Sequence, residues 1–184
     1  MRTLTFTIKF HGPFRVSAGH GRGGVDDVLD QHDWLPATSL KGVMRATAKN
    51  LLGPDSDHVQ EVFGGDHGPS PWRWSSARPD GEGWFEPYPA ARIAIDEATH
   101  TARDDMLAFA EQTAADRATF TVTQFGHIDG DTMRRHELVL AISGQATRSI
   151  GALRRRGLGW VSIRCTDRHL DEDAVDEFME LISR

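Results

Sequence analysis

The chain has 184 residues, a single cysteine and a net charge of −6 at pH 7. One cysteine excludes an intrachain disulfide framework and a zinc site built from cysteines. The negative charge argues against a protein that coats nucleic acid with its whole surface, although it leaves local binding open. We predict one domain over residues 1–184, because this length supports one core and no linker-like segment divides it. The sequence has neither a signal-like start nor an apolar run of membrane-spanning length, so we expect a cytoplasmic protein without a membrane partner.

The first predicted element is a half-buried strand over residues 4–10, where apolar and polar side chains alternate. Residues 17–36 follow without regular apolar periodicity and contain four glycines, four aspartates and two histidines. We interpret this segment as a long, flexible loop. Loops of this length in a compact domain often carry function, so its polar residues are candidate functional residues.

A helix is predicted from about residue 38, with Thr38 or Ser39 as its N-cap, to the stop signal Gly53-Pro54. One face of this helix carries the apolar residues Leu40, Val43, Met44, Ala48 and Leu51. Beside that face runs one basic stripe, formed at every fourth position by Lys41, Arg45 and Lys49. Such stripes are more often solvated faces than binding sites. Here the stripe starts at a helix N-terminus after a glycine-rich loop, which favours anion binding.

The middle of the chain is predicted to form short elements, namely one or two helical turns at residues 58–63 and strands at residues 72–74 and 84–85. A projecting hairpin follows, with a first strand over residues 91–96, a turn within 97–105 and an apolar return over 106–109. Three tryptophans in and before this region, Trp34, Trp72 and Trp74, either stack on bases or lie partly buried in the core. Burial in the core is the more common state of such tryptophans.

The C-terminal part is predicted to contain a strand over residues 119–125, a helix over 131–146, a strand over 159–163 and an amphipathic helix over about 171–183. The helix over 131–146 competes with a strand, because Leu138, Leu140 and Ile142 also alternate. The last helix is expected to turn inward Ala174, Phe178, Leu181 and Ile182. The order of elements predicts an α+β, ferredoxin-like (RRM-like) domain with a long first loop and a central insertion. A sheet with two helices is also a common platform for RNA.

Three consecutive arginines, Arg154 to Arg156, stand between glycines before the strand over residues 159–163. Glycine lets main-chain N–H groups approach a phosphate closely, and arginine adds charge and bidentate donors. The segment is therefore either a clamp for a nucleic-acid backbone or a solvated glycine-rich turn. Together with the basic stripe of the first helix, the clamp interpretation predicts one side of a groove for RNA.

Two of these motifs resemble a known family. Leu35 to Arg45 read LPATSLKGVMR, similar to the IPGSSLKGxxR helix start of the RAMP superfamily proteins of CRISPR effector complexes. Residues 150–159 resemble the C-terminal glycine-rich loop of that family. Residues 62–64, 93–96 and 119–120 lie in the family's order between the two motifs. The resemblance covers residues 3 to about 164, with Ala37-Thr38 where the family has Gly-Ser.

Within this superfamily, the chain is most similar to the single-domain backbone subunit of type III complexes. The resemblance implies that several copies line up along a guide (CRISPR) RNA, together with other CRISPR effector subunits. It also implies that the subunit cleaves target RNA bound to the guide. A projecting thumb hairpin, here about residues 94–109, is implied to insert between guide and target bases.

The resemblance places the family's catalytic aspartate in the first loop, in a pattern like Ile-Asp-x-Pro-Val. The closest match is Val25 to Leu29, which makes Asp26 the first candidate, Asp27 the second and Asp30 the third. The match lacks the proline, and the loop that follows it is shorter. A carboxylate here could accept the proton of the RNA 2′-hydroxyl or position a hydrated cation. We therefore expect Asp26 to bind Mg²⁺ or another divalent cation transiently.

Guide RNA is expected to be held through its phosphates, independently of its sequence. The predicted RNA-binding residues are Ser39, Lys41, Arg45, Lys49, Gly151, Arg154, Arg155, Arg156, Gly157 and Gly159. His20 and His32 are nearby candidates for proton transfer. Two alternatives stay open. One is a scaffold subunit that binds guide RNA without cleaving. The other is an endoribonuclease that processes guide precursors, which typically uses a histidine and a second ferredoxin-like domain; this chain is too short to include that domain.

Overall fold

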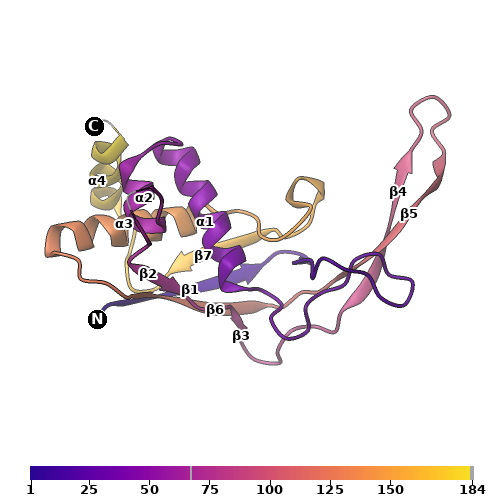
Figure 1. Cartoon of the computed structure of the whole chain (residues 1–184), viewed down its shortest axis with the longest axis horizontal. Coiled ribbons are helices and arrows are strands. Elements are labelled where there is room, and N and C mark those ends of the chain that lie inside the picture. The colour runs from indigo at the N-terminus through magenta and orange to yellow at the C-terminus, as the bar shows by residue number, and fades with distance from the viewer. Residues whose placement is uncertain (67, 183–184) are drawn as a thin grey trace.

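A computed structural model of the protein describes residues 1–66 and 68–182, and only the main chain of Asp104 and Asp105. The elements in chain order are β1 (Thr3–Phe10), α1 (Ala37–Leu52), α2 (Asp57–Phe63), β2 (Trp72–Trp74), β3 (Arg78–Pro79), β4 (Tyr88–Ile95), β5 (Ala102–Gln112), β6 (Arg117–Gln124), α3 (Gly130–Ala146), a 3₁₀ turn (Arg154–Arg156), β7 (Val161–Cys165) and α4 (Glu172–Ile182). Figure 1 shows a body, in which the helices gather on one face of a sheet, and a long hairpin of β4 and β5 that projects from it.

The body is built around an antiparallel sheet with the strand order β2-β6-β1-β7, and the short β3 also pairs with β6. Helix α1 lies in the connection from β1 to β2, and α3 connects β6 to β7. If the hairpin insertion and β3 are set aside, the strands stand in the order fourth, first, third, second. This order is that of a ferredoxin-like domain, so the predicted α+β fold class is confirmed.

The core lies between the sheet and the helices. Leu4, Phe6 and Ile8 alternate along β1 and are fully buried. Phe120 of β6 pairs with Phe6 and stacks on it, with ring centroids 5.0 Å apart. Helix α1 completes this core with residues at helical spacing, Leu40, Met44 and Ala48. The polar residues of β1 and β6 consequently point to the opposite, open face of the sheet.

Helix α3 confirms the helix predicted over residues 131–146, and its surroundings explain the competing alternation. Asp129 caps the helix, because its Oδ1 accepts the N–H of Thr132 at 3.0 Å. Val139 and Leu140 pack in the main core, whereas Leu138 packs against the buried residues of α4. Because the helix is covered on two sides, apolar residues occur on both sides of it. Their spacing in the sequence therefore resembles the alternating pattern of a strand.

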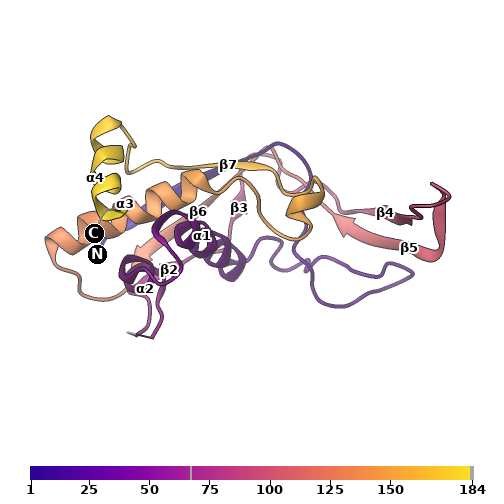
Figure 2. The ribbon, with the colours of Figure 1, turned by 90° about the horizontal axis from the view of Figure 1, so that it is seen from above.

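The hairpin of β4 and β5, called the thumb from here on, extends away from the body in both views (Figures 1 and 2). It occupies residues 88–112 and is longer than the predicted insertion at 94–109. Strand β4 alternates only between exposed and half-buried positions and has no buried residue, so no strong apolar period marks residues such as Pro89 and Ala90. At its tip, Asp96 Oδ1 accepts the N–H groups of Ala98 and Thr99 at 3.0 and 2.9 Å.

Two details of the sequence prediction are wrong. Residues 84–85 form no strand; Trp84 instead packs on Phe10 and Phe14, with ring centroids 5.9 and 5.4 Å apart. Ile182 does not face inward but is 44% exposed, because the buried face of α4 consists of Ala174 and Phe178. Residue 183 of the predicted last helix lies outside the described residues. Within the described part of the chain, no helix is long and apolar enough to cross a bilayer.

Candidate nucleic-acid interface

Residues 17–36, called the aspartate loop from here on, form no helix or strand, as predicted. The loop nevertheless lies against the base of the thumb. Val28 and Leu29 are buried, and the Leu29 N–H donates to Glu111 Oε2 of β5 at 3.0 Å. Isolated bridges connect Ser17 with Leu29 and Asp27 with Ala110. These contacts fix where the aspartates lie, while the predicted flexibility of the loop stays a prediction.

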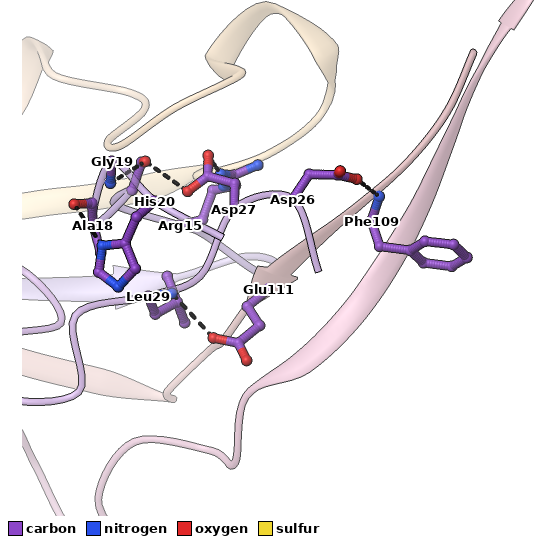
Figure 3. A network of polar contacts seen from close by, with 10 residues as sticks. Arg15, Ala18, Gly19, His20, Asp26, Asp27, Leu29, Phe109 and Glu111 are labelled. Atoms are coloured by element: carbon purple, nitrogen blue, oxygen red, sulfur yellow. Dashed lines mark hydrogen bonds and ion pairs between the residues drawn. The ribbon is translucent and has the colours of Figure 1, made fainter. Parts of the chain in front are cut away.

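Asp26 is an exposed residue at the base of the thumb. Its main-chain N–H donates to the carbonyl of Phe109 at 2.9 Å, and its Oδ2 accepts the Phe109 N–H at 2.7 Å. Figure 3 shows its carboxylate directed toward β5, away from the carboxylate of the neighbouring Asp27. Asp26 therefore combines a held orientation with access to solvent.

Asp27 and Asp30 are engaged differently. The Asp27 carboxylate pairs with the buried guanidinium of Arg15 and accepts the hydroxyl of Ser17 at 2.6 Å (Figure 3). The Asp27 carbonyl also accepts the Glu111 N–H at 2.9 Å. Asp30 Oδ1 accepts the main-chain N–H of His32 at 2.9 Å, which stabilises a local turn. The three predicted catalytic aspartates thus do not converge on one point.

The same geometry limits how a metal ion could be held. Among the described residues, no three acidic, histidine or cysteine side chains are close enough together to form a metal site. Magnesium needs only one or two protein carboxylates where substrate phosphates supply further ligands. The exposed carboxylate of Asp26 fits this minimal arrangement, whereas Asp27 is committed to Arg15.

Helix α1 holds the basic stripe on one half-buried flank. The helix begins at Ala37 with Pro36 as N-cap, so neither Thr38 nor Ser39 is the cap; the fixed φ of proline suits a helix start. Lys41 Nζ lies 5.1 Å from the ring centroid of Trp74. Burial, and to a smaller degree the charge of Arg45, lowers the pKa of Lys41. The stripe therefore places three cations near one another, and the first turn of the helix contains no acidic residue that would neutralise them.

The glycine-arginine segment, called the arginine loop from here on (residues 148–160), lies on the helix side of the sheet between α1 and the thumb (Figures 1 and 2). Its three arginines are exposed on a short 3₁₀ turn. Gly151 and Gly159 have φ of +72° and +75°, and a Cβ at either would overlap a carbonyl oxygen, of Arg15 or Ile150. The Gly159 N–H donates to the Pro13 carbonyl at 2.8 Å. Close packing within the protein therefore accounts for these two glycines, while Gly157 faces open space.

A family model of the RAMP superfamily matches residues 7–162, which is more than half of the chain. The chain belongs to the RAMP superfamily. The matched residues run from β1 into β7 and include the aspartate loop, the thumb and the arginine loop. The resemblance of the two sequence motifs is thereby confirmed.

Solved structures share the fold of this RAMP protein at low sequence identity. A chain in the cryo-EM structure of the type III-B Cmr-beta bound to cognate target RNA matches with a TM-score of 0.67 and 10% identity, covering 91% of this chain and 98% of that chain. A chain of the Cmr-beta apo state matches with a TM-score of 0.63 and 11% identity, covering 94% and 98%. Comparison with curated proteins finds no match.

The three tryptophans that the sequence offered for base stacking pack within this RAMP protein. Trp72 and Trp74 are 3% and 7% exposed, which confirms that they belong to the core. Trp34 is half-buried and stacks on Trp84, with ring centroids 6.3 Å apart. Base stacking by Trp72 or Trp74 would require them to leave the core.

Arg15 is the main residue that the sequence prediction missed. It is 2% exposed, pairs with Asp27, and its carbonyl accepts the N–H of Ala152 in the arginine loop at 2.8 Å. Arg15 therefore connects the aspartate loop with the arginine loop. A single arginine after a predicted strand carries no signal of this role, which depends on long-range folding.

Proposed function

We propose that this RAMP protein is a backbone subunit of a type III CRISPR effector complex, which binds guide RNA and cleaves complementary target RNA. The observation that best supports this proposal is the position of Asp26. This exposed residue is held at the base of the thumb, at the same end of the molecule as the arginine loop. Membership in the family and a fold shared with a Cmr-beta chain support the proposal. Guide RNA, target RNA, further copies of the chain and other effector subunits are its proposed partners.

Guide RNA is proposed to lie on the helix side of the body, held through its phosphates. The stripe of Lys41, Arg45 and Lys49 and the arginine loop both provide cations on this side. Lys41 and Arg156 line separate cavities of about 370 and 180 Å³, so the RNA would bridge two basic surfaces rather than fill one closed groove. Phosphate contacts of this kind are independent of sequence, as a subunit that carries many guides requires.

The thumb exposes apolar side chains that suit contact with bases. Ile93 of β4 and Leu107 of β5 are cross-strand partners and are 55% and 56% exposed. Ile95 and Met106 are exposed apolar residues of the same hairpin, at 52% and 50% exposure. Apolar side chains that enter a base stack separate neighbouring bases. A nucleotide displaced beside the thumb would come close to Asp26 at its base.

Cleavage is proposed to use the 2′-hydroxyl of the target RNA as nucleophile. The displaced nucleotide would bring this hydroxyl into line with the adjacent phosphorus, and Asp26 would accept its proton. As the 2′-oxygen bonds to phosphorus, the bond from phosphorus to the 5′-oxygen would break, which leaves a 2′,3′-cyclic phosphate and a 5′-hydroxyl that takes its proton from water. The hydrogen bond from Phe109 N–H fixes the direction of the Asp26 carboxylate. A divalent cation held by Asp26 and by RNA phosphates would neutralise the charge that develops on the phosphate.

One observation favours a scaffold without catalysis as the second candidate. The hydrogen bonds between Asp26 and Phe109 attach the aspartate loop to the thumb, which is a sufficient structural role for Asp26. Asp26→Asn separates the two functions, because the amide oxygen can still accept the Phe109 N–H but cannot accept a proton as a base. Among the described residues, no observation favours the processing of guide precursors.

The cleavage proposal is tested with complexes assembled on one guide RNA. We expect Asp26→Asn to slow target cleavage by at least about a hundredfold in the presence of Mg²⁺, since positioned bases contribute about that much or more. Asp33→Asn is the matched control, with expected wild-type rates, because Asp33 lies in the same loop and its carboxylate accepts the Ser76 hydroxyl at 2.6 Å. Cleavage at the wild-type rate by Asp26→Asn would leave only the scaffold function.

The binding proposal has its own test with the full chain and labelled guide RNA. We expect Arg45→Gln to weaken binding by about tenfold, the effect of losing one charged contact. It should also reduce the slope of log K against log salt by about 0.7. Arg164→Gln is the control, because Arg164 is exposed on the open face of the sheet, opposite α1. Equal losses in both variants would contradict binding along α1.

A further inference from the structure

A small cavity of about 180 Å³ lies where the arginine loop meets the thumb base. Its walls come from three segments that are far apart in sequence. Arg15 lies in the segment that follows β1. Arg92 and Gln112 belong to the thumb, and Leu153 and Arg156 belong to the arginine loop. Of these arginines, only Arg156 belongs to the three consecutive exposed arginines, Arg154 to Arg156.

Two arginines that line this cavity each have a buried donor without a partner among the described residues. Arg15 is 2% exposed; one of its terminal nitrogens pairs with Asp27, but its Nε has no hydrogen-bond partner among the described residues. The Nε of Arg92 is likewise buried and unpartnered within the described structure. Burial, and next the charge of Arg92, lowers the pKa of Arg15. Buried donors without acceptors are unfavourable, and an anion in the cavity would offset part of the uncompensated positive charge of these two side chains.

Positive charge predominates among the described residues around the cavity. Arg15, Arg92 and Arg156 line it, and the described lining contains no acidic residue. Asp27 pairs with Arg15 from the side of the aspartate loop and balances only one of these charges. Arginine donors suit the oxygens of a phosphate. The volume of about 180 Å³ is large enough for a phosphate group with part of a sugar.

We propose that this cavity is a phosphate site, in which Arg15, Arg92 and Arg156 bind one phosphodiester group of single-stranded RNA. The inference rests on the proposed function in one respect, since it takes the RNA to be the guide or the target strand. Ala110 lines the cavity, and its neighbours Phe109 and Glu111 hydrogen-bond to Asp26 and Asp27. A phosphate bound here therefore sits against the strand that orients the candidate catalytic loop, and the arginines act as positioning residues.

Inorganic phosphate tests the site without RNA. We expect phosphate to raise the Tm of the full chain relative to chloride at equal ionic strength, because a ligand of the native state stabilises it. Arg92→Gln should lose most of this shift, while its Tm in chloride should equal or exceed that of the wild type, since a repulsive contact with Arg15 is removed. Arg103→Gln is the control in the same hairpin, because Arg103 is exposed and pairs with Asp96. Equal phosphate shifts in all three proteins would overturn the proposal.

Single-stranded RNA tests the arginine triple. We expect Arg156→Gln to weaken binding of the labelled strand that supplies the phosphate, guide or target, by about tenfold. Arg155→Gln should weaken it clearly less, because Arg155 does not line the cavity. Since Arg92 and Arg156 share one phosphate, the loss in the double variant should fall well below the product of the single losses. A shared site would be contradicted if the Arg155 and Arg156 variants lost RNA affinity equally and if the affinity losses at Arg92 and Arg156 multiplied in the double variant.

The same variants show which strand supplies the phosphate. If it belongs to the guide, Arg92→Gln weakens binding of guide RNA alone; if it belongs to the target, guide binding is kept and target cleavage or target binding falls. The outcome is independent of Asp26, because Asp26→Asn leaves the phosphate-induced Tm shift in place whether or not it abolishes cleavage. No effect of Arg92→Gln on guide binding, target binding or target cleavage would overturn the site.

Discussion

The body and the thumb end of this protein are stabilised in different ways. In the body, apolar side chains such as Phe6 and Phe120 are buried between the sheet and the helices. At the thumb end, single polar contacts connect the loops, including those of Asp26 with Phe109 and of Asp27 with Arg15. The fold therefore depends on the body, whereas the candidate chemistry depends on a few contacts that can change without loss of the core.

The largest effect that tests this comparison is expected in the core. Phe120→Ala should lower the free energy of unfolding by about 3–5 kcal/mol, because Phe120 is 1% exposed and stacks on Phe6. Ile93→Ala on the thumb removes a side chain that is 55% exposed and should change stability by about 0.5 kcal/mol or less. Urea unfolding measures both. Similar losses would mean that body and thumb share one stabilising core.

The next effect concerns the arginine loop, where the main chain is tightly packed. Gly159→Ala should destabilise the protein by about 3 kcal/mol, because its Cβ would overlap the Ile150 carbonyl at a φ of +75°. Gly157→Ala is the matched control with a φ of +85° but open space, and should cost only about 1 kcal/mol. Equal costs in thermal or urea unfolding would show that backbone conformation, and not packing, determines the role of Gly159.

A pH effect is expected in the body. Burial lowers the pKa of His136, and the nearby Glu61 offsets this only in part. Its Nδ1 also accepts the Trp72 indole N–H at 3.1 Å, which requires a ring nitrogen without a proton. Below the ordinary histidine pKa of about 6.5 the unfolded chain binds the extra proton first, so stability falls as the pH decreases, by at most about 1.4 kcal/mol per pH unit.

Unfolding at pH 7.5 and 5.5 checks this effect. His136→Gln should reduce the difference between the two pH values, whereas His11→Gln should not, because His11 lies on the open face of the sheet with Ser162. An unchanged pH dependence in His136→Gln would show that another group is responsible.

The smallest effect on stability is expected at the thumb, where we expect target cleavage to change instead. Replacing the exposed pair Ile93 and Leu107 by serine should leave the free energy of unfolding within about 0.5 kcal/mol of the wild type. Target cleavage should fall, because the apolar surface proposed to separate bases is removed. Cleavage rates with one assembled guide complex measure this, and unchanged rates would contradict base contact by the thumb.

The sequence predicted the body well because burial imposes a period on it. Leu4, Phe6 and Ile8 repeat every second residue, and Leu40, Met44 and Ala48 follow the helix period, so β1 and α1 were identifiable. The family motifs located the aspartate loop and the arginine loop. The thumb limits were missed, because β4 alternates only between exposed and half-buried positions, which leaves no strong apolar period.

The contacts between segments were beyond the sequence. Nothing local to Arg15 indicates that it meets Asp27 and Ala152, or that it shares a cavity with Arg92. The glycines at 151 and 159 were correctly recognised as special, but phosphate approach was the predicted reason and close main-chain packing is the observed one. Such contacts depend on how distant segments fold together, and one sequence carries no record of them.

Hydrogen exchange of the full chain with and without guide RNA tests the central claim most directly, because it reports both regions in one experiment. We predict slower exchange of main-chain amides in the N-terminal turn of α1, in the arginine loop and at the thumb base when RNA is bound. Main-chain amides of β1, β6 and β7, whose polar side chains form the open face of the sheet, should be unchanged. Protection concentrated around Lys9, Arg117 and Arg164 on that open face would contradict an RNA interface on the helix side.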